Sequence, residues 1–212
     1  MTGKLLILAT GLLAATASWG LTITVDGLAG DWGATAPLTT DPDEAFQLAP
    51  YDISDIFATM DATDFFFRMD TYGTPTLEGE QGQMVFFAVC LDTDQNSATG
   101  YNPGWDPGTT FGGEVLITYM PSHGMTGVYD CSSGSLVPVG IGGFGIGETV
   151  ELSAPLAWLN LTGNVDLMAF LDNASTPEDD FTSVVTFEIP EPTTMLLLGV
   201  GAVFASVLRR KS

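Results

Sequence analysis

Apolar and polar residues alternate in short runs along most of this chain, and clusters of turn residues separate the runs. The runs are rich in β-branched and aromatic residues, which is typical of β-strands. They predict ten strands, at residues 21–25, 53–60, 65–71, 84–91, 114–119, 127–131, 136–139, 149–152, 165–171 and 183–189. Only residues 154–161 are compatible with a helical turn. Such a series of short strands predicts an all-β fold, a two-sheet antiparallel β-sandwich of the jelly-roll type.

Residues 140–147 form the most glycine-rich stretch of the chain. A phosphate-binding loop would need a Lys or a Ser/Thr directly after such glycines, and neither follows here. We therefore expect a flexible connection at this place.

Both ends of the chain are hydrophobic and differ from its middle. The N-terminus has Lys4, an almost unbroken apolar run at residues 5–13, and the small-x-small sequence Ala15-Thr16-Ala17. This order predicts a cleaved signal peptide at residues 1–17. A buried helix of a soluble protein is the alternative, but two such segments at opposite ends of one chain argue against it. One exported domain, at residues 18–189, is therefore expected between the two ends.

The C-terminus has three parts in order: Pro190-Glu191-Pro192, apolar residues at 195–208, and Arg209-Arg210-Lys211. The two prolines keep the tripeptide extended and accessible. As a helix, residues 193–208 would be about 24 Å long, which is short for a hydrocarbon core of about 30 Å but sufficient with snorkelling ends. Cations at the end favour the cytoplasmic side, which places everything upstream outside.

This order of tripeptide, apolar segment and basic cluster resembles the PEP-CTERM sorting signal of exported bacterial proteins. The resemblance implies that residues 190–212 are a sorting signal with a transmembrane segment. It also implies that an exosortase-like membrane peptidase recognises Pro190, Glu191 and Pro192. The protein would then be anchored transiently in the inner membrane before it reaches the cell surface or the extracellular matrix. An ordinary anchor that is never cleaved is the alternative interpretation.

Charge is distributed very unevenly along the chain. The net charge is −21, and Arg68 is the only Lys or Arg between Lys4 and Arg209. A surface this negative repels nucleic acid and anionic lipid, and it attracts divalent cations. Solubility alone is the alternative explanation for the acidic composition. Nucleic acid is therefore excluded as a partner, whereas a cation remains a candidate ligand.

The chain contains two cysteines, Cys90 and Cys131, and both follow strand-like runs. An exported domain matures under oxidising conditions, and neighbouring strands would bring the two thiols together. This predicts a Cys90–Cys131 disulfide, with two buried free thiols as the alternative.

Alternating oxygen-bearing side chains follow the strand predicted at residues 84–91. In Asp92-Thr93-Asp94-Gln95-Asn96 such a series can curl around a hard cation, and Ca²⁺ takes six to eight oxygen ligands. The segment is not an EF-hand loop, because Ser97 and Pro103 stand where that loop needs Gly and a bidentate Glu. We predict a structural Ca²⁺ held by Asp92, Asp94, Asn96 and Glu114. A solvated turn held by Asx hydrogen bonds is the alternative.

The same loop continues into aromatic residues placed on Pro/Gly turns. Tyr101, Asn102, Trp105 and Asp106 form a candidate glycan surface, since sugar rings stack on aromatic faces while Asp and Asn bind hydroxyls. A loop that folds back and buries Trp105 is the alternative. Trp158 is expected in the core.

The order of several motifs resembles one superfamily. The Asp26-Gly27 turn, Asp31-Trp32, the loop that begins at Asp92, and the strand that ends at Pro155-Leu156 follow one another as in DOMON-like sandwiches and family-nine carbohydrate-binding modules. The similarity covers most of residues 21–189. It implies a non-catalytic binding module without an organic cofactor, and here extracellular polysaccharide is the first candidate ligand. Trp32 is expected to be buried below the first turn rather than to stack on a sugar.

Three other functions remain open. A structural matrix protein without a small ligand is the strongest rival. A haem-binding electron carrier of the DOMON type would depend on His123, the only histidine, but Met120 and Met125 are too close in sequence to approach haem from the opposite face. A hydrolase is not expected, because the many carboxylates come without a Ser-His-Asp context or a zinc-binding cluster.

Overall fold

The computed structural model describes residues 22–44, 48–77, 86–104, 109–121, 124–161, 163–172 and 180–189. The chain divides into one compact unit, Thr22–Glu188, and a second unit made of Met1–Leu21 and Ile189–Ser212. The predicted signal peptide and sorting tail lie outside the described residues. Within the described residues, no helix combines the length and apolar character that crossing a membrane would require.

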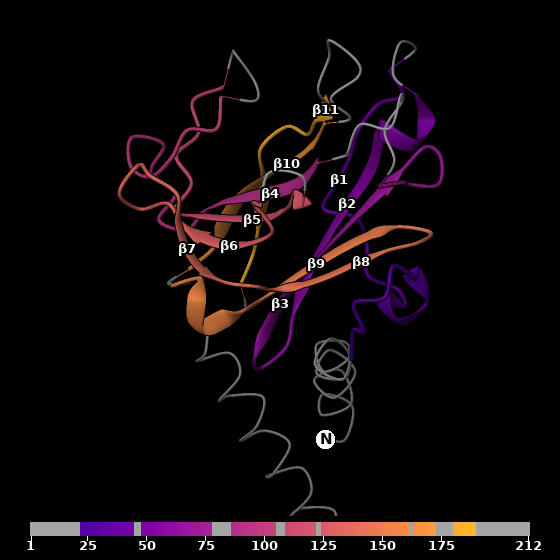
Figure 1. Ribbon diagram of the computed structural model, residues 1–212, viewed down its shortest axis with the longest axis horizontal. Helices are drawn as coiled ribbons and strands as arrows, with labels where there is room; N and C mark the ends of the chain where they lie inside the picture. Colours follow the sequence, from indigo (N-terminus) through magenta and orange to yellow (C-terminus); the bar gives the residue numbers. More distant parts are fainter. Residues whose placement is uncertain are drawn as a thin grey trace, which may run out of the picture. The chain divides into compact units, whose positions relative to one another are not determined.

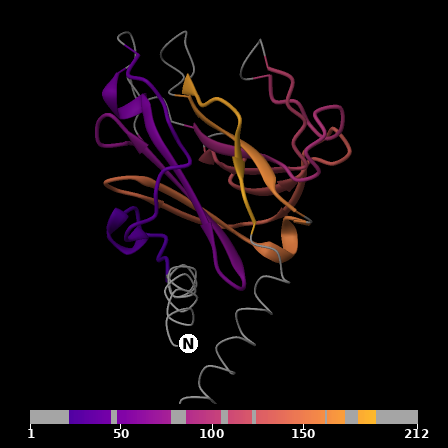
Figure 2. The same ribbon diagram turned by 180° about the vertical axis from the view of Figure 1, so that it is seen from behind.

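Two antiparallel sheets make up the compact unit (Figure 1). The first has the order β1-β2-β3-β9-β8, with β1 at Thr39–Thr40, β2 at Ile53–Met60, β3 at Asp64–Thr71, β8 at Gly143–Ile146 and β9 at Val150–Pro155. The second has the order β11-β10-β4-β5-β6-β7, with β4 at Phe86–Asp92, β5 at Val115–Tyr119, β6 at Gly127–Asp130, β7 at Val137–Gly140, β10 at Val165–Asp172 and β11 at Asp180–Phe181. Strand β12, Val185–Phe187, also pairs with β10 and runs beside it in yellow in Figure 2. The predicted all-β class and the predicted pair of antiparallel sheets are confirmed.

In the described part of the chain, three short 3₁₀ helices lie before or between these strands: η1 at Ala29–Trp32, η2 at Ala49–Tyr51 and η5 at Leu156–Trp158. The last of them confirms the helical turn predicted within residues 154–161. Trp158 at its end is half-buried, and its ring fills the space beside Gly140.

Most of the predicted strands agree with the structure within about two residues, but the first one is wrong. Residues 22–25 form no strand. Side chains fix this backbone instead, because the Thr24 amide donates to Asp31 Oδ2 (2.5 Å) and the Asp26 amide donates to Glu151 Oε2 (2.8 Å). Strands β1 and β11 were not predicted. Each has only two residues, which is too short to produce an alternating pattern.

The glycine-rich stretch is the second correction. Instead of a flexible connection, it contains β8, the edge strand of the first sheet, which pairs with β9. The glycines are needed because another segment of backbone passes over the strand: a Cβ on Gly145 would lie 2.6 Å from the Gly27 amide nitrogen. Glycine here reflects a close approach of two backbones and not a mobile loop.

Apolar side chains of alternate strand positions fill the space between the sheets. Phe65 and Phe87 are fully buried there. Phe87 of β4 contacts Phe144 of β8 with ring centroids 6.3 Å apart, and Phe65 of β3 contacts Phe187 of β12 at 5.6 Å. These pairs join the two sheets, since each contact has one ring from either sheet.

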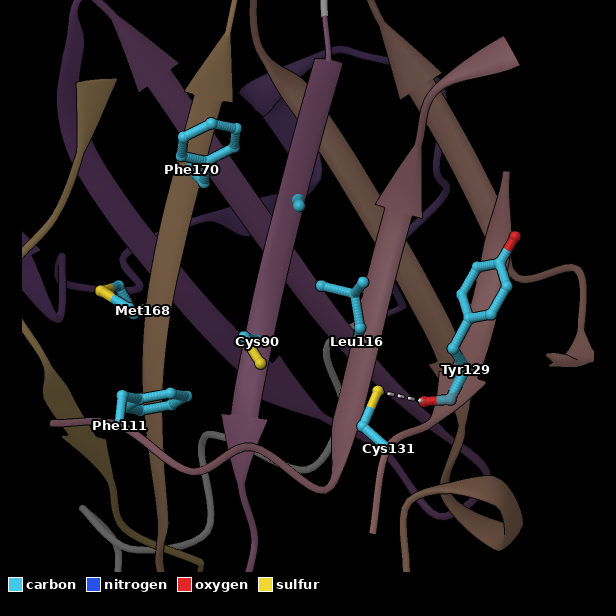
Figure 3. Packing of buried hydrophobic residues seen from close by; sticks show 8 residues of the cluster. Cys90, Phe111, Leu116, Tyr129, Cys131, Met168 and Phe170 are labelled. Carbon is cyan, nitrogen blue, oxygen red and sulfur yellow. Dashed lines mark hydrogen bonds between the residues drawn. The ribbon is translucent and has the colours of Figure 1, made fainter. Parts of the chain in front are cut away.

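The outer face of the second sheet is also covered. Met168, Cys90, Leu116 and Tyr129 are directly opposite one another on β10, β4, β5 and β6, and all four are buried (Figure 3). Phe111, from the loop between β4 and β5, packs on the same cluster. That loop is therefore held against the sheet by a small apolar core of its own.

Candidate functional site

Three carboxylates converge where β4 ends and β5 begins. Asp92 is the last residue of β4, Asp94 follows two residues later, and Glu114 directly precedes β5. Antiparallel pairing of Leu91 with Val115 places Asp92 and Glu114 side by side at the ends of neighbouring strands. One carboxylate oxygen from each of the three residues lies within 4.8 Å of the others. The structure thus brings together three of the four predicted Ca²⁺ ligands.

Hydrogen bonds from the loop hold these carboxylates in place. Glu114 Oε2 accepts from the Thr93 amide (2.9 Å), and Glu114 Oε1 accepts from the Thr99 hydroxyl (3.3 Å). Asp94 Oδ2 also lies within hydrogen-bonding distance of this hydroxyl (3.0 Å), so the two carboxylates share its single proton. Thr93 and Thr99 were not predicted as part of the site. The sequence signal that could have identified Thr99 is its position in an acidic loop, directly before Gly100.

Asn96, the fourth predicted ligand, acts on the site through its backbone. Its amide donates to Asp92 Oδ1 (3.1 Å) and to Asp94 Oδ1 (2.9 Å). Its side-chain oxygen accepts from the Ala98 amide (3.2 Å), which is an Asx turn. The Asx hydrogen bonds of the alternative interpretation are therefore present, and they exist together with the cluster of carboxylates.

A backbone bridge between Tyr101 and Gly113 closes the loop beside Glu114. Tyr101 and Gly113 exchange both backbone hydrogen bonds, at 2.8 and 2.9 Å. Gly100, with φ +68°, provides the left-handed turn before this bridge, and a Cβ there would lie 2.5 Å from Glu114 Oε1. This closure fixes the direction in which the loop leaves the sheet.

The electrostatics of the site favour a cation. Asp92 is 4 % exposed, and burial, with further contributions from Glu114 and Asp94, raises its pKa to about 6, although the Asn96 amide opposes this shift. Arg68 is the only Lys or Arg of the compact unit, and it forms an ion pair with Asp70. No Lys or Arg of the unit is therefore available to neutralise the three carboxylates. All-oxygen donors of this kind suit a hard divalent cation such as Ca²⁺.

Two of the four predicted glycan-binding residues can be placed. Tyr101 is half-buried and packs against the apolar cluster on the outer face of the second sheet. Asn102 is exposed, and its side-chain oxygen accepts from the Gly104 amide (2.9 Å). Trp105 and Asp106 lie outside the described residues, as does His123. In the described part of the loop, Tyr101 and Asn102 support its shape.

The predicted Cys90–Cys131 disulfide is not formed in the structure, where both cysteines are free and buried. Cys90 is opposite Leu116 on β5, and Leu116 is opposite Tyr129, two residues before Cys131 (Figure 3). Strand β5 thus lies between the two cysteines, and two strand spacings are about 9.6 Å. A disulfide needs Cα atoms within about 7 Å. Their thiols share an apolar cluster instead.

Trp32 is buried as predicted, with 1 % of its surface exposed. Its indole nitrogen donates to Glu151 Oε1 (2.5 Å), a carboxylate with no exposed surface. The other oxygen, Oε2, accepts from the Asp26 and Gly27 amides. Glu151 was not singled out in the sequence, because a single Glu inside an apolar strand carries no motif. This carboxylate holds the first turn and Trp32 on the sheet.

Comparison with known proteins supports the interpretation of the C-terminus. Residues 188–211 match the PEP-CTERM protein-sorting motif. This match confirms the sorting signal predicted at residues 190–212, and it supports export followed by exosortase processing at the membrane. No curated protein shows a significant match to the chain.

Proposed function

We propose that the protein is a non-catalytic, polysaccharide-binding module that exosortase processing delivers to the cell surface or extracellular matrix. The motif at residues 188–211 supports this route. The compact unit is the cargo, and a Ca²⁺ ion bound by Asp92, Asp94 and Glu114 stabilises the loop that contacts the polysaccharide.

One observation carries the proposal for the module: the convergence of three carboxylates at the base of the loop that contains the aromatic residues. The loop leaves the sheet at Asp92 and returns at Glu114, so both ends of the loop meet at the proposed cation. A bound ion would link them directly and reduce the freedom of the residues between them. A loop that is rigid before binding loses less entropy when it contacts a ligand.

The apolar cluster on the outer face of the second sheet also helps to hold this loop in place. Phe111 and Tyr101 pack on the outer face of the second sheet, near the two ends of the segment that contains Trp105. With these two aromatics anchored, Trp105 and Asp106 are the residues left to contact a sugar. We therefore assign ligand contact to Trp105 and Asp106, and support of the loop to Tyr101 and Asn102.

Calcium and glycan binding can be tested together on the exported chain. We expect Ca²⁺ to raise its melting temperature, and we expect Asp94→Asn to remove the part of this increase that the loop site provides. Glu148→Gln, a change of the same charge at an exposed position outside the cluster, is the matched control. Equal calcium responses of all three proteins would contradict a cation at this loop.

A glycan array, followed by affinity electrophoresis in the best polysaccharide, tests ligand contact. Trp105→Ala should abolish retention while leaving the melting temperature within about 2 °C of the parent. The half-buried Trp158 provides the control, because Trp158→Phe changes an aromatic residue without touching the loop. If the Trp105→Ala protein is retained like the parent, the loop is not the contact surface.

Replacing the sorting tripeptide tests delivery separately. With Pro190, Glu191 and Pro192 all changed to Ala, we expect the chain to accumulate uncleaved in the membrane fraction. The same chain with Ser212→Ala should be processed normally. Release of the triple variant into the medium at the parental rate would exclude recognition of the tripeptide.

A structural matrix protein is the second candidate, and the edge strand β7 favours it. Val137 and Val139 are 50 % and 40 % exposed on β7, and Ile141 directly after the strand is 77 % exposed. An apolar edge of this kind can pair with another chain. Concentration-dependent assembly that Val139→Lys removes, without any glycan binding by the parent, would favour this function.

A further inference from the structure

A second group of carboxylates lies away from the calcium loop. Asp41 and Glu44 follow β1, and Asp180 begins β11. One oxygen from each of these three side chains lies within 4.8 Å of the others. Asp41 and Glu44 are close in the sequence, but Asp180 is far from both. The fold therefore brings the three carboxylates together.

The group connects the edges of the two sheets. Strand β1 is the outer strand of the first sheet, and β11 lies at the edge of the second. Asp180 Oδ2 accepts a hydrogen bond from the Ile53 amide (2.5 Å), where β2 of the first sheet begins. The backbone of Asp41 is fixed as well: its amide donates to the Ser54 carbonyl (2.8 Å), and its carbonyl accepts from the Tyr72 hydroxyl (2.8 Å). The carboxylate of Asp180 and the backbone of Asp41 are thus held in position.

A fourth carboxylate beside the group is buried, and one of its two oxygens lacks a hydrogen-bond partner. Asp52, between η2 and β2, is 1 % exposed, and its Oδ1 accepts no hydrogen bond. The buried Oε2 of Glu44 also has no partner. These two side chains contact each other, but both oxygens are acceptors, so neither satisfies the other unless a proton or a cation lies between them. A buried carboxylate oxygen without a partner is costly, and it indicates a missing positive charge.

Among the described residues of the compact unit, no side chain supplies this charge. Arg68 is its only Lys or Arg, and Asp70 and the Phe57 ring occupy the guanidinium. Burial first, and neighbouring carboxylates in addition, raise the pKa of Asp180 and of Asp52 to about 7. These shifts express the same lack of a counter-charge that the geometry shows.

We propose that Asp41, Glu44 and Asp180 bind a second Ca²⁺ ion, with Asp52 beside Glu44 as the fourth acidic group of the site. This ion would join β1 and β11 and so link the two sheets at their edges. The ligands are all carboxylate oxygens, and no Cys or His takes part. That favours Ca²⁺ over zinc or copper, and the negative charge of four carboxylates suits an ion that tolerates many anionic ligands. This site is independent of the calcium loop and of any polysaccharide.

The number of bound ions provides the test. With the full chain in mild detergent, we expect calorimetric titration with Ca²⁺ to give about two ions per chain. Glu44→Gln and Asp41→Asn should each reduce this to about one and leave the loop site intact. Asp94→Asn should also give about one ion, and Asp94→Asn combined with Glu44→Gln should give none. Two variants of the new site are included in case one of them folds poorly.

Asp55→Asn is the matched control. Asp55 lies nearby on β2, but its side chain accepts from the Thr40 hydroxyl (2.8 Å) and takes no part in the group. This variant should bind the same number of ions as the parent. The proposal is overturned if Glu44→Gln and Asp41→Asn bind as many ions as the parent, or if the Asp94→Asn protein binds none. If the Asp94→Asn protein binds no ion, the four carboxylates share protons instead of a cation. The Glu44→Gln chain should then melt at a higher temperature than the parent when a chelator is present.

Discussion

The indole of Trp32 donates its only hydrogen bond to the fully buried carboxylate of Glu151, at 2.5 Å. Glu151 lies on β9, so this contact joins the N-terminal turn to the centre of the first sheet. Two backbone amides of the turn, at Asp26 and Gly27, donate to the same carboxylate. One side chain therefore replaces the strand pairing that residues 22–25 do not form.

Glu151→Ala should destabilise the protein strongly. It leaves two buried donors and one part-buried donor without an acceptor, and hydrogen bonds to a charged group contribute about 1.5–3 kcal/mol each. We expect a loss of about 3 kcal/mol or more in the free energy of unfolding, measured by urea denaturation. Glu151→Gln keeps one acceptor and should cost less, and the exposed Glu148→Ala should cost little. Similar midpoints for all four proteins would show that Glu151 does not hold the turn.

The contribution of Arg68 to stability should depend on the planar shape of its guanidinium and not on its charge alone. Its Nε and Nη2 donate to the two oxygens of Asp70, at 2.8 and 2.5 Å, and its guanidinium carbon lies 3.8 Å from the centre of the Phe57 ring. Lysine keeps the charge but cannot form this fork or stack in the same way. Arg68→Lys should therefore lower the free energy of unfolding by about 1–2 kcal/mol. A double-mutant cycle with Asp70→Asn measures the coupling, and a coupling near zero would contradict this account.

The stability of the calcium-free protein should fall as the pH rises. Burial and neighbouring carboxylates raise the pKa of Asp41 to about 6, and those of Asp52 and Asp180 to about 7. An Asp in the unfolded chain has a pKa near 3.9. Because folding favours the protonated form, this contribution is complete below about pH 4 and is lost as the pH rises through 6 to 7.

Thermal unfolding in a calcium chelator checks this expectation. The melting temperature should be lower at pH 8 than at pH 5, and excess Ca²⁺ should remove much of the difference by neutralising the carboxylates. Glu44 and Asp43 also face this group, so Glu44→Gln should flatten the profile. A chelated protein that becomes more stable between pH 5 and pH 8 would show that other groups dominate.

The two cysteines should react slowly in the native protein. Burial raises the pKa of Cys131 to about 12 and that of Cys90 well above its usual value, so neither forms a thiolate readily. We expect negligible labelling by iodoacetamide at pH 8 before denaturation, and two labelled thiols per chain after it. Intact mass spectrometry under non-reducing conditions provides the measurement. A mass lower by two hydrogens, with no labelling after denaturation, would instead identify a disulfide.

The sequence predicted those parts of the fold that depend on local pattern. Strands such as β2 and β10 are eight-residue runs of mainly apolar residues bounded by turn residues, and a local pattern of this kind is enough to recognise them. The two-residue strands β1 and β11 were missed because they depend on tertiary contacts alone. Strand β8 was missed because its glycines are required by a close contact with the backbone at Gly27, which lies more than a hundred residues earlier in the sequence.

The two candidate sites also differ in how far the sequence could predict them. Asp92, Asp94 and Glu114 were all named from the sequence, and the pairing of β4 with β5 brings them together. Asp41, Glu44, Asp52 and Asp180 carry no common motif, since they meet only after the two sheets have packed. Asp180 could be assigned only from the structure, because its carboxylate bonds to Ile53 on the other sheet.

The surroundings of Arg68 have a practical consequence for a protein that leaves the cell. Trypsin-like proteases cut after Lys or Arg, and between Lys4 and Arg209 the chain offers them this one residue. Arg68 is 9 % exposed and lies inside a paired strand, so the folded domain presents no accessible cleavage site to such enzymes. Amine-reactive cross-linkers likewise find no lysine there. The exported domain should therefore persist in environments rich in trypsin-like activity. Only after unfolding should trypsin cut it after Arg68 and give two large fragments.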